Sequence, residues 1–385
     1  MRRRLTIWAL LVAGALFVGA CADAQTSTTK SAVPEEERRL FADVNVAIHD
    51  VPLDEIIFDT FDGGQVPLTD ASEELVRSLL NAIRPLDDPS YIAGADATYL
   101  MPDDLVLGYV ADDGTAWAHP HRVMNFHEIV NTTLAERPVA ITYCPLCGSG
   151  VVFDRRPDDL RHEGVLTFDN TSALYESDMV MVDAETHTYW WHIAGRGIVG
   201  NLTGSELVTL PSTTTTWSTW LASHPDTMVL SNDQGRGPSY EFDPFVDHAI
   251  RVDAGALRFP VGPAAFADER LAPSTRVIGF ELDGDHTAVP VLVNEPTAVR
   301  LSGSDDELVV LLDGAGGGSV FHSDRSFRSD GDGFVDEEGV RWDLAGRAER
   351  GARLAPVPSR TAFWFAWVSL TEGDTRLFGP NGEID

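Results

Sequence analysis

The sequence has 385 residues, of which 43% are apolar and 9% aromatic, and this composition is typical of a folded protein of up to two domains rather than a disordered chain. Its 60 acidic residues outnumber its 28 lysines and arginines, which gives a formal net charge of −32. Such an acidic surface repels phosphate backbones, so we expect no nucleic-acid partner.

The first 21 residues have the pattern of a lipoprotein signal peptide. Three arginines precede an apolar run over residues 5–20, which is shorter than the ~20 residues of a membrane span. The run ends in Val-Gly-Ala-Cys, so Cys21 is the expected lipidation site, and cleavage near Ala20 without a lipid is the alternative. Residues 22–45 are expected to form a flexible tether. We therefore expect export, with a lipid anchoring the protein on the outer face of the cytoplasmic membrane.

Beyond the tether the pattern predicts mainly short strands and a few helices. An alternating pattern around an Asp112-Asp113-Gly114 turn predicts a hairpin over residues 105–120. Val123, Phe126 and Val130 recur at helical spacing and predict a helix over residues 121–134. β-Branched runs predict further strands within residues 138–144, 150–154 and 179–193. A threonine-rich capping run predicts a second helix within residues 213–224.

Three stretches of the sequence recur in the same order. "LMPDDLVLGYVADDGTAWAHP" returns as "LAPSTRVIGFELDGDHTAVP", "WHIAGRGIVG" as "WDLAGRAERG", and "LPSTTTTWSTW" as "VPSRTAFWFAW". We therefore predict a mainly β fold with minor α content. It would consist of two tandem, divergent copies of one β-rich unit, each with one or two short helices, related by a pseudo-twofold axis. The first unit would span residues 46–250 and the second, degenerate unit residues 251–385.

The stretch "TYCPLCGSGVVFD", residues 142–154, holds the candidate site. It contains Cys144 and Cys147, and the second copy has "LLDGAGGGSVFHSD" in its place. Since the fold itself does not require these cysteines in both copies, they are candidates for function. Pro145 fixes the backbone between them, and a turn of this kind can direct both sulfurs to one point. The pair is interpreted as a metal knuckle, a reactive dithiol or a structural disulfide.

A metal site needs more ligands than two cysteines. His127, 17 residues before Cys144, is the first candidate, and Met181, which shares a strand face with Met179, is the next. Thiolate, imidazole and thioether ligands favour a soft ion, copper above all, with zinc or no metal as the alternatives. This interpretation predicts metal handling or electron transfer, together with a metal-transfer or redox partner of unknown identity.

Two other interpretations of the cysteines stay open. Cys144 and Cys147 would be catalytic in an extracytoplasmic thiol–disulfide oxidoreductase, and merely oxidised in a non-catalytic binding module. The sequence "GSGVVFDR" predicts a strand after the pair, whereas thioredoxin-like proteins place a helix there. Glu128, Asp178 and Asp183 are candidate general acids or bases, although carboxylates in so acidic a chain are mostly at the surface.

These motifs resemble a known family. "HEIVN", "TYCPLCGSGVVFD", "LYESDMVMVDAET", "LPSTTTTWSTWLASHPDTMVLS" and "FWFAW" are similar to the prokaryotic domain of unknown function 3179 family. The resemblance covers about residues 90 to 380 and implies export and a Cys-Pro-x-Cys signature, but no established activity. The sequence departs from the family pattern at His119, where such proteins commonly have tyrosine, so that His119 is an added ligand or a neutral replacement.

Overall fold

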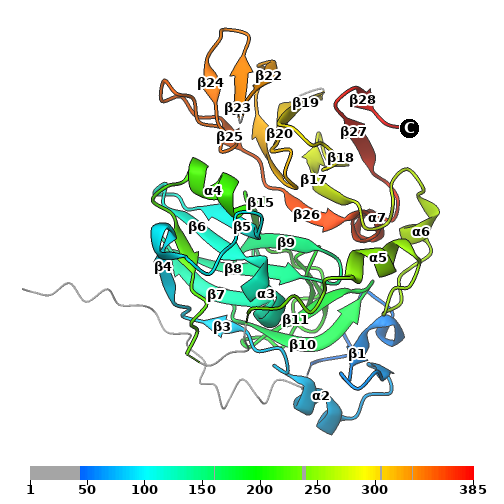
Figure 1. The fold of residues 1–385 in the computed structure, drawn as a ribbon. Coiled ribbons are helices and arrows are strands. Elements are labelled where there is room, and N and C mark those ends of the chain that lie inside the picture. Colours follow the sequence, from blue (N-terminus) through cyan, green and yellow to red (C-terminus); the bar gives the residue numbers. More distant parts are fainter. Residues whose placement is uncertain (1–43, 160, 236–239, 304–305, 332) are drawn as a thin grey trace, which may run out of the picture.

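The structure is a computed structural model that describes residues 44–159, 161–235, 240–303, 306–331 and 333–385 (Figure 1). The predicted signal peptide, Cys21 and nearly all of the predicted tether lie outside these residues. The described chain is mainly β, as predicted, and its strands form four sheets joined by short helices. Within this part of the chain, every helix is too short or too polar to cross a membrane.

A six-stranded antiparallel sheet comes entirely from residues 57–199. Both faces of its central strands are buried, which explains their continuous apolar runs. Its strands lie in the order β13 (Arg196–Val199), β12 (Tyr189–Trp191), β11 (Asp178–Asp183), β10 (Phe168–Tyr175), β1 (Ile57–Asp59) and β2 (Gln65–Pro67).

Two larger sheets each combine strands from both halves of the chain. The ten-stranded sheet has the order β28 (Gly382–Glu383), β27 (Arg376–Gly379), β18 (Asp285–Pro290), β17 (Arg276–Leu282), β26 (Arg360–Phe363), β9 (Ser149–Asp154), β8 (Arg137–Cys144), β7 (Ile129–Leu134) and β3 (Leu86–Asp87), with β14 (Thr209–Leu210) beside β9. The nine-stranded sheet has the order β19 (Thr297–Ser302), β20 (Glu307–Leu312), β21 (Gly318–His322), β15 (Thr213–Thr216), β5 (Leu105–Val110), β6 (Ala116–Pro120), β16 (Met228–Leu230) and β4 (Tyr91–Ala93), with β25 (Ala355–Pro356) beside β21.

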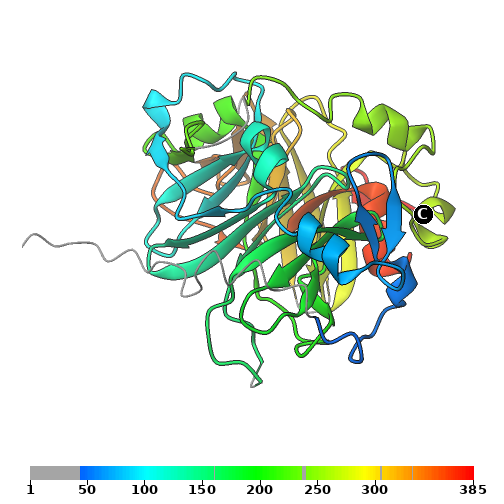
Figure 2. The ribbon, with the colours of Figure 1, turned by 90° about the horizontal axis from the view of Figure 1, so that it is seen from below.

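A small sheet and eight short helices complete the described elements. The small sheet contains β22 (Phe327–Asp330), β23 (Gly333–Asp336) and β24 (Arg341–Trp342). The helices are η1 (Leu53–Glu55), α2 (Glu73–Leu79), η2 (Gly94–Asp96), α3 (His121–His127), α4 (Trp217–Ser223), α5 (His248–Asp253), α6 (Ala264–Ala267) and α7 (Trp364–Thr371). The first described residues and α7 lie on the same side of the molecule (Figure 2) and share one hydrophobic core.

One arrangement of elements occurs twice in the described chain. The β5–β6 hairpin is joined by β15, which is antiparallel to β5, and by β16, which is parallel to β6, and α4 lies between them in sequence. The β17–β18 hairpin is joined in the same way by β26 and β27, with α7 between them. Trp220 packs on Gly108 and Trp367 on Gly279, where a Cβ atom would lie only 2.2 Å from each ring.

The helix predicted over residues 121–134 is wrong beyond residue 127. α3 ends at His127, because Glu128 has a φ of 57°, and Ile129 begins β7, which pairs with β8. The β-branched residues of this stretch favour the strand once a partner strand is present. The second predicted helix, α4, begins at Trp217, directly after the threonine run, as predicted. Thr216 caps it, and Thr213–Thr216 also forms β15.

The β8–β9 hairpin separates two hydrophobic cores. Side chains alternate along a strand, so Val139, Ile141 and Tyr143 face a core that includes residues of α3. Ala140 and Cys144 face a second core, which includes β10, β11 and β12 of the six-stranded sheet. Cys144 therefore lies on the opposite face of the hairpin from α3, and this fixes which side chains can reach it.

Candidate metal centre

Asp178 meets the two cysteines of the Cys-Pro-Leu-Cys turn. Cys144 ends β8 and Cys147 lies in the turn before β9, whereas Asp178 begins β11 in the six-stranded sheet. Their ligand atoms, two sulfurs and one carboxylate oxygen, all lie within 4.8 Å of one another. Both cysteines are free thiols, and the Cys147 thiol donates to Oδ1 of Asp178 at 2.7 Å. This cluster of Cys144, Cys147 and Asp178 can hold a metal ion.

The cysteine turn is held by the C-terminal half of the chain. The main-chain N–H of Phe363 donates to the carbonyl of Cys147 at 2.8 Å, and Nε2 of His248 donates to the carbonyl of Leu146 at 2.6 Å. Gly148 has a φ of 58°, and a Cβ atom there would lie 2.9 Å from the ring of Phe363. The turn therefore requires glycine at this position both for its backbone conformation and for space.

His192 directs its Nδ1 toward Asp178 of the cluster. The hydroxyl of Thr142 donates its proton to the carbonyl of Val151 at 2.9 Å, so it accepts a hydrogen bond from Nε2 of His192, also at 2.9 Å. A neutral imidazole protonated at Nε2 has an unprotonated Nδ1. This Nδ1 lies 3.0 Å from Oδ1 of Asp178 and 3.2 Å from Oγ of Ser149. Thr142 thus orients His192 so that its Nδ1 borders the cluster.

The whole cluster is shielded from solvent. Cys144 and Asp178 are each 1% exposed, and Cys147 and His192 are fully buried. Burial raises the pKa of the Cys144 thiol and raises the pKa of the Cys147 thiol well above its usual range, with the negative charge of Asp178 adding to both effects. Without a cation, both thiols are therefore neutral at physiological pH, and a bound metal ion is the kind of partner that would stabilise them as thiolates.

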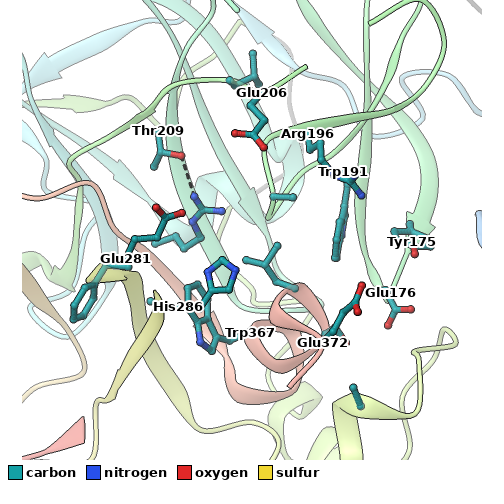
Figure 3. A pocket seen from close by; sticks show the side chains of 18 of the residues that line it. Tyr175, Glu176, Trp191, Arg196, Glu206, Thr209, Glu281, His286, Trp367 and Glu372 are labelled. Carbon is teal, nitrogen blue, oxygen red and sulfur yellow. Dashed lines mark hydrogen bonds between the residues drawn. The ribbon is translucent and has the colours of Figure 1, made fainter. Parts of the chain in front are cut away.

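A polar chain connects the cluster with a large cavity. The second carboxylate oxygen of Asp178 accepts the main-chain N–H of Ile193 at 2.7 Å, and the guanidinium of Arg360 donates to the carbonyl of Ile193. Arg360 also donates to Thr209 at 3.1 Å and lines a cavity of about 1000 Å³ (Figure 3). Residues close in sequence to Asp178 and His192 line the same cavity: Tyr175, Glu176, Trp191 and Ala194.

The structure does not bring His127 to the cysteines. His127 lies at the end of α3, on the other face of the hairpin, and is not part of the cluster of ligand atoms. Its Nδ1 lies 2.8 Å from the carbonyl of Arg84 and its Nε2 lies 2.6 Å from the hydroxyl of Tyr240. Both nitrogens are therefore occupied, and His127 is not one of the residues whose ligand atoms converge on the cysteines.

Met179 and Met181 lie in the same strand as Asp178, but on its opposite face. Both methionines are buried in β11, and Met181 is paired across the ladder with Trp190. Alternation along the strand directs Met179 and Met181 to the face opposite Asp178. The amide of Asn170 donates to the sulfur of Met179 at 3.3 Å. The methionines are thus placed as core side chains.

The other carboxylates and histidines singled out in the sequence have local partners. Glu128 accepts from Asn170 at 2.8 Å, and burial raises its pKa to about 8. Asp183 accepts from Nε1 of Trp190 at 2.8 Å. His119 is fully buried between the hydroxyl of Tyr91 and a main-chain carbonyl. The four tryptophans at positions 190, 191, 217 and 220 are all buried.

Comparison of two recurring sequence stretches could have drawn attention to His192. "WHIAGRGIVG" aligns with "WDLAGRAERG", so His192 corresponds to Asp343. His192 therefore differs between the two stretches, as the cysteines do. Asp178 lies outside the stretches that recur in the sequence, so this comparison does not reach it.

The fold and the cluster define a mainly β protein with a buried site that can hold a metal ion. The chain belongs to the family described as "Protein of unknown function (DUF3179)", which it matches over residues 81–374. The match includes every residue of the cluster. Comparison with curated proteins and with solved structures gives no significant match.

Proposed function

We propose that the protein binds one metal ion through the two sulfurs of Cys144 and Cys147 and a carboxylate oxygen of Asp178, with Nδ1 of His192 as the fourth ligand. The observation that carries the proposal is the convergence of three ligand atoms within 4.8 Å in a solvent-shielded space. Thr142 accepts a hydrogen bond from Nε2 of His192, and metal-binding histidines usually have such a partner on the ring nitrogen that does not bind the metal.

Zinc fits this set of donors best. Tetrahedral zinc sites are built from cysteine, histidine and carboxylate ligands, and all three kinds meet here. Copper was expected from thiolate, imidazole and thioether donors, but a carboxylate is a hard ligand that monovalent copper does not favour. The ion would join the cysteine turn of the ten-stranded sheet to the six-stranded sheet. Because four protein groups surround it, the site is suited to holding an ion tightly rather than to exposing it to a substrate.

The thiol–disulfide interpretation has less support. Exchange requires an accessible thiolate, whereas Cys144 and Cys147 are buried and the pKa of each thiol is raised. Both features are compatible with a metal site, since an ion supplies the positive charge that thiolates need. Reaction of the native chain with a thiol-specific disulfide reagent should accordingly be slow and should accelerate on unfolding.

Metal analysis of matched variants tests the proposal. The full-length chain is loaded with zinc or with monovalent copper under anaerobic, reducing conditions, desalted, and analysed by mass spectrometry for metal per chain. We expect one zinc ion in the wild type and loss of that ion in Cys144→Ser, Cys147→Ser and Asp178→Asn. His127→Gln and Glu128→Gln are controls that alter buried groups outside the cluster and should retain zinc. Retention in Cys147→Ser, or loss in His127→Gln, would contradict the proposal.

We also propose that the chain is exported and lipid-anchored through Cys21, where it would handle metal on the outer face of the cytoplasmic membrane. The basic residues, the short apolar run and the Val-Gly-Ala-Cys sequence support this proposal. Metabolic labelling with a palmitate analogue in a bacterial host should mark the wild type and leave Cys21→Ser unmarked. Equal labelling of both chains would refute the anchor.

A duplication of one β-rich unit is our proposal for the origin of the fold. Its support is the recurrence of a hairpin, an antiparallel strand, a short helix and a parallel strand, with a tryptophan packed on a glycine in each set. The ten-stranded sheet would then combine five strands of each copy, and the nine-stranded sheet five strands of the first copy with four of the second. Only the first copy would have kept or gained the metal ligands.

A further inference from the structure

A second cavity, of about 430 Å³, lies outside the metal centre. It lies where the β5–β6 hairpin and α4 meet β21, β25 and the segment 345–357. Figure 1 shows α4 in the lower part of the molecule facing β25 in the upper part. Its volume falls within the ~300–1000 Å³ range of small-molecule sites.

The walls of this cavity are mainly apolar. They include Tyr109, Leu210, Trp220, Val320, Phe321 and Val357. Trp220 is fixed in place because it packs on Gly108, and its Nε1 donates to Thr227 at 2.9 Å. A rigid apolar wall of this kind favours the hydrocarbon part of a ligand, because little side-chain freedom is lost on binding.

The charged residues that line the cavity are mainly positive, whereas the molecule as a whole is negative. Three arginines and a single carboxylate, that of Asp112, line it in a chain of net charge −32. Arg137 pairs with Asp112 at 2.6 Å, and Arg347 pairs with Asp343 at 2.9 Å. Arg353 is exposed and forms no ion pair or side-chain hydrogen bond with the described residues. Its guanidinium is the cationic group at this cavity that is free for a ligand.

His224 lines the same cavity as an uncharged side chain. It is 7% exposed and stacks on Trp220 with ring centroids 4.0 Å apart. Burial, followed by the nearby charge of Arg347, lowers its pKa to about 4. At neutral pH the positive charge of the cavity therefore comes from its arginines, which remain charged throughout the accessible pH range.

We propose that this cavity binds an organic monocarboxylate with an apolar body, of the size of a medium-chain fatty acid, with its carboxylate on Arg353 and its hydrocarbon chain against Trp220 and Val320. The proposal does not depend on the metal centre. It rests on the pairing of an apolar cavity with one uncompensated guanidinium, which is complementary to a ligand with a single negative end.

Calorimetric titration with octanoate tests this site. The full-length wild type is compared with Arg353→Gln and with Arg350→Gln, a control that removes an exposed arginine of the same segment that does not line the cavity. Loss of a hydrogen bond to a charged group should weaken octanoate binding about tenfold in Arg353→Gln and leave it unchanged in Arg350→Gln. 1-Octanol, which has the same chain without the charge, should bind wild type and Arg353→Gln equally.

Three results would overturn the proposal. The first is the absence of octanoate binding to the wild type at concentrations up to about 5 mM. A specific site of this size should have a dissociation constant below that concentration. The second is equal binding of octanoate to Arg353→Gln and Arg350→Gln. The third is wild-type binding of 1-octanol as tight as that of octanoate. Arg353 is exposed, so its substitution leaves the fold intact and each result bears on the ligand site itself.

Discussion

Nδ1 of His192 lies 3.0 Å from Oδ1 of Asp178, in a space between two sheets that solvent does not reach. Since Nε2 of His192 is engaged by Thr142, the two facing atoms are both hydrogen-bond acceptors in the neutral imidazole and the carboxylate. Two such atoms at this distance repel one another unless a proton or a metal ion lies between them. The sulfurs of Cys144 and Cys147 in the same space favour the metal ion.

Replacement of Thr142 by valine should lower zinc affinity without removing a ligand. The hydroxyl of Thr142 accepts from His192, and loss of an outer partner of a metal-binding histidine costs about tenfold or more in affinity. Thr214→Val is the matched control, because the Thr214 hydroxyl is buried without a hydrogen-bond partner in the described chain. Competition with a fluorescent chelator measures both. Equal affinities in the two variants would show that Thr142 does not orient a ligand.

Zinc affinity should rise with pH across the neutral range. The pKa values of the Cys144 and Cys147 thiols are raised, so the metal-free site holds protons that an ion must displace. Each proton released makes binding about tenfold tighter per pH unit as long as the thiol remains protonated in the free site. Chelator competition at three pH values, with proton release measured in weak buffer, checks this expectation. A pH-independent affinity would be incompatible with thiol ligands.

Glu128→Gln should become more stable than the wild type as pH increases. The Glu128 carboxyl has a pKa of about 8 in the fold against 4.5 as its ordinary value, so between these two values the unfolded chain binds fewer protons than the folded chain. The wild type therefore loses stability as pH rises through this window, by at most about 1.4 kcal/mol per pH unit, and the glutamine variant does not. Denaturant unfolding at pH 5 and pH 8 should reveal the difference. A constant offset between the two chains would contradict a buried, neutral Glu128.

Gly148→Ala should destabilise the fold more than Gly114→Ala. Both glycines have positive φ, so alanine costs about 1–2 kcal/mol at either position. At Gly148 the added methyl group also meets the ring of Phe363, which adds about 1–3 kcal/mol, whereas Gly114 has open space. We expect zinc retention to fall only in Gly148→Ala. The free energies of unfolding come from urea titration, and similar values for the two variants would show that the cysteine turn tolerates displacement.

The sequence allowed local features to be predicted better than contacts between distant residues. The two strands beside the cysteines were predicted because their β-branched runs are short and bounded by turn residues. His127 was a reasonable ligand by spacing, yet the alternation of β8 places Cys144 on the opposite face of the hairpin from α3. Asp178 approaches Cys147 only through packing of the six-stranded sheet on the ten-stranded sheet. No local pattern encodes that approach, because it depends on which faces of the two sheets meet.

X-ray absorption at the zinc edge of the zinc-loaded, full-length chain identifies the atoms bound to the ion. We expect two sulfur neighbours at about 2.3 Å and two oxygen or nitrogen neighbours at about 2.0–2.1 Å, one of them an imidazole. His192→Gln should lose the imidazole signal, whereas His127→Gln should leave the spectrum unchanged. A shell without sulfur, or the same imidazole signal in His192→Gln, would contradict a zinc site formed by Cys144, Cys147, Asp178 and His192.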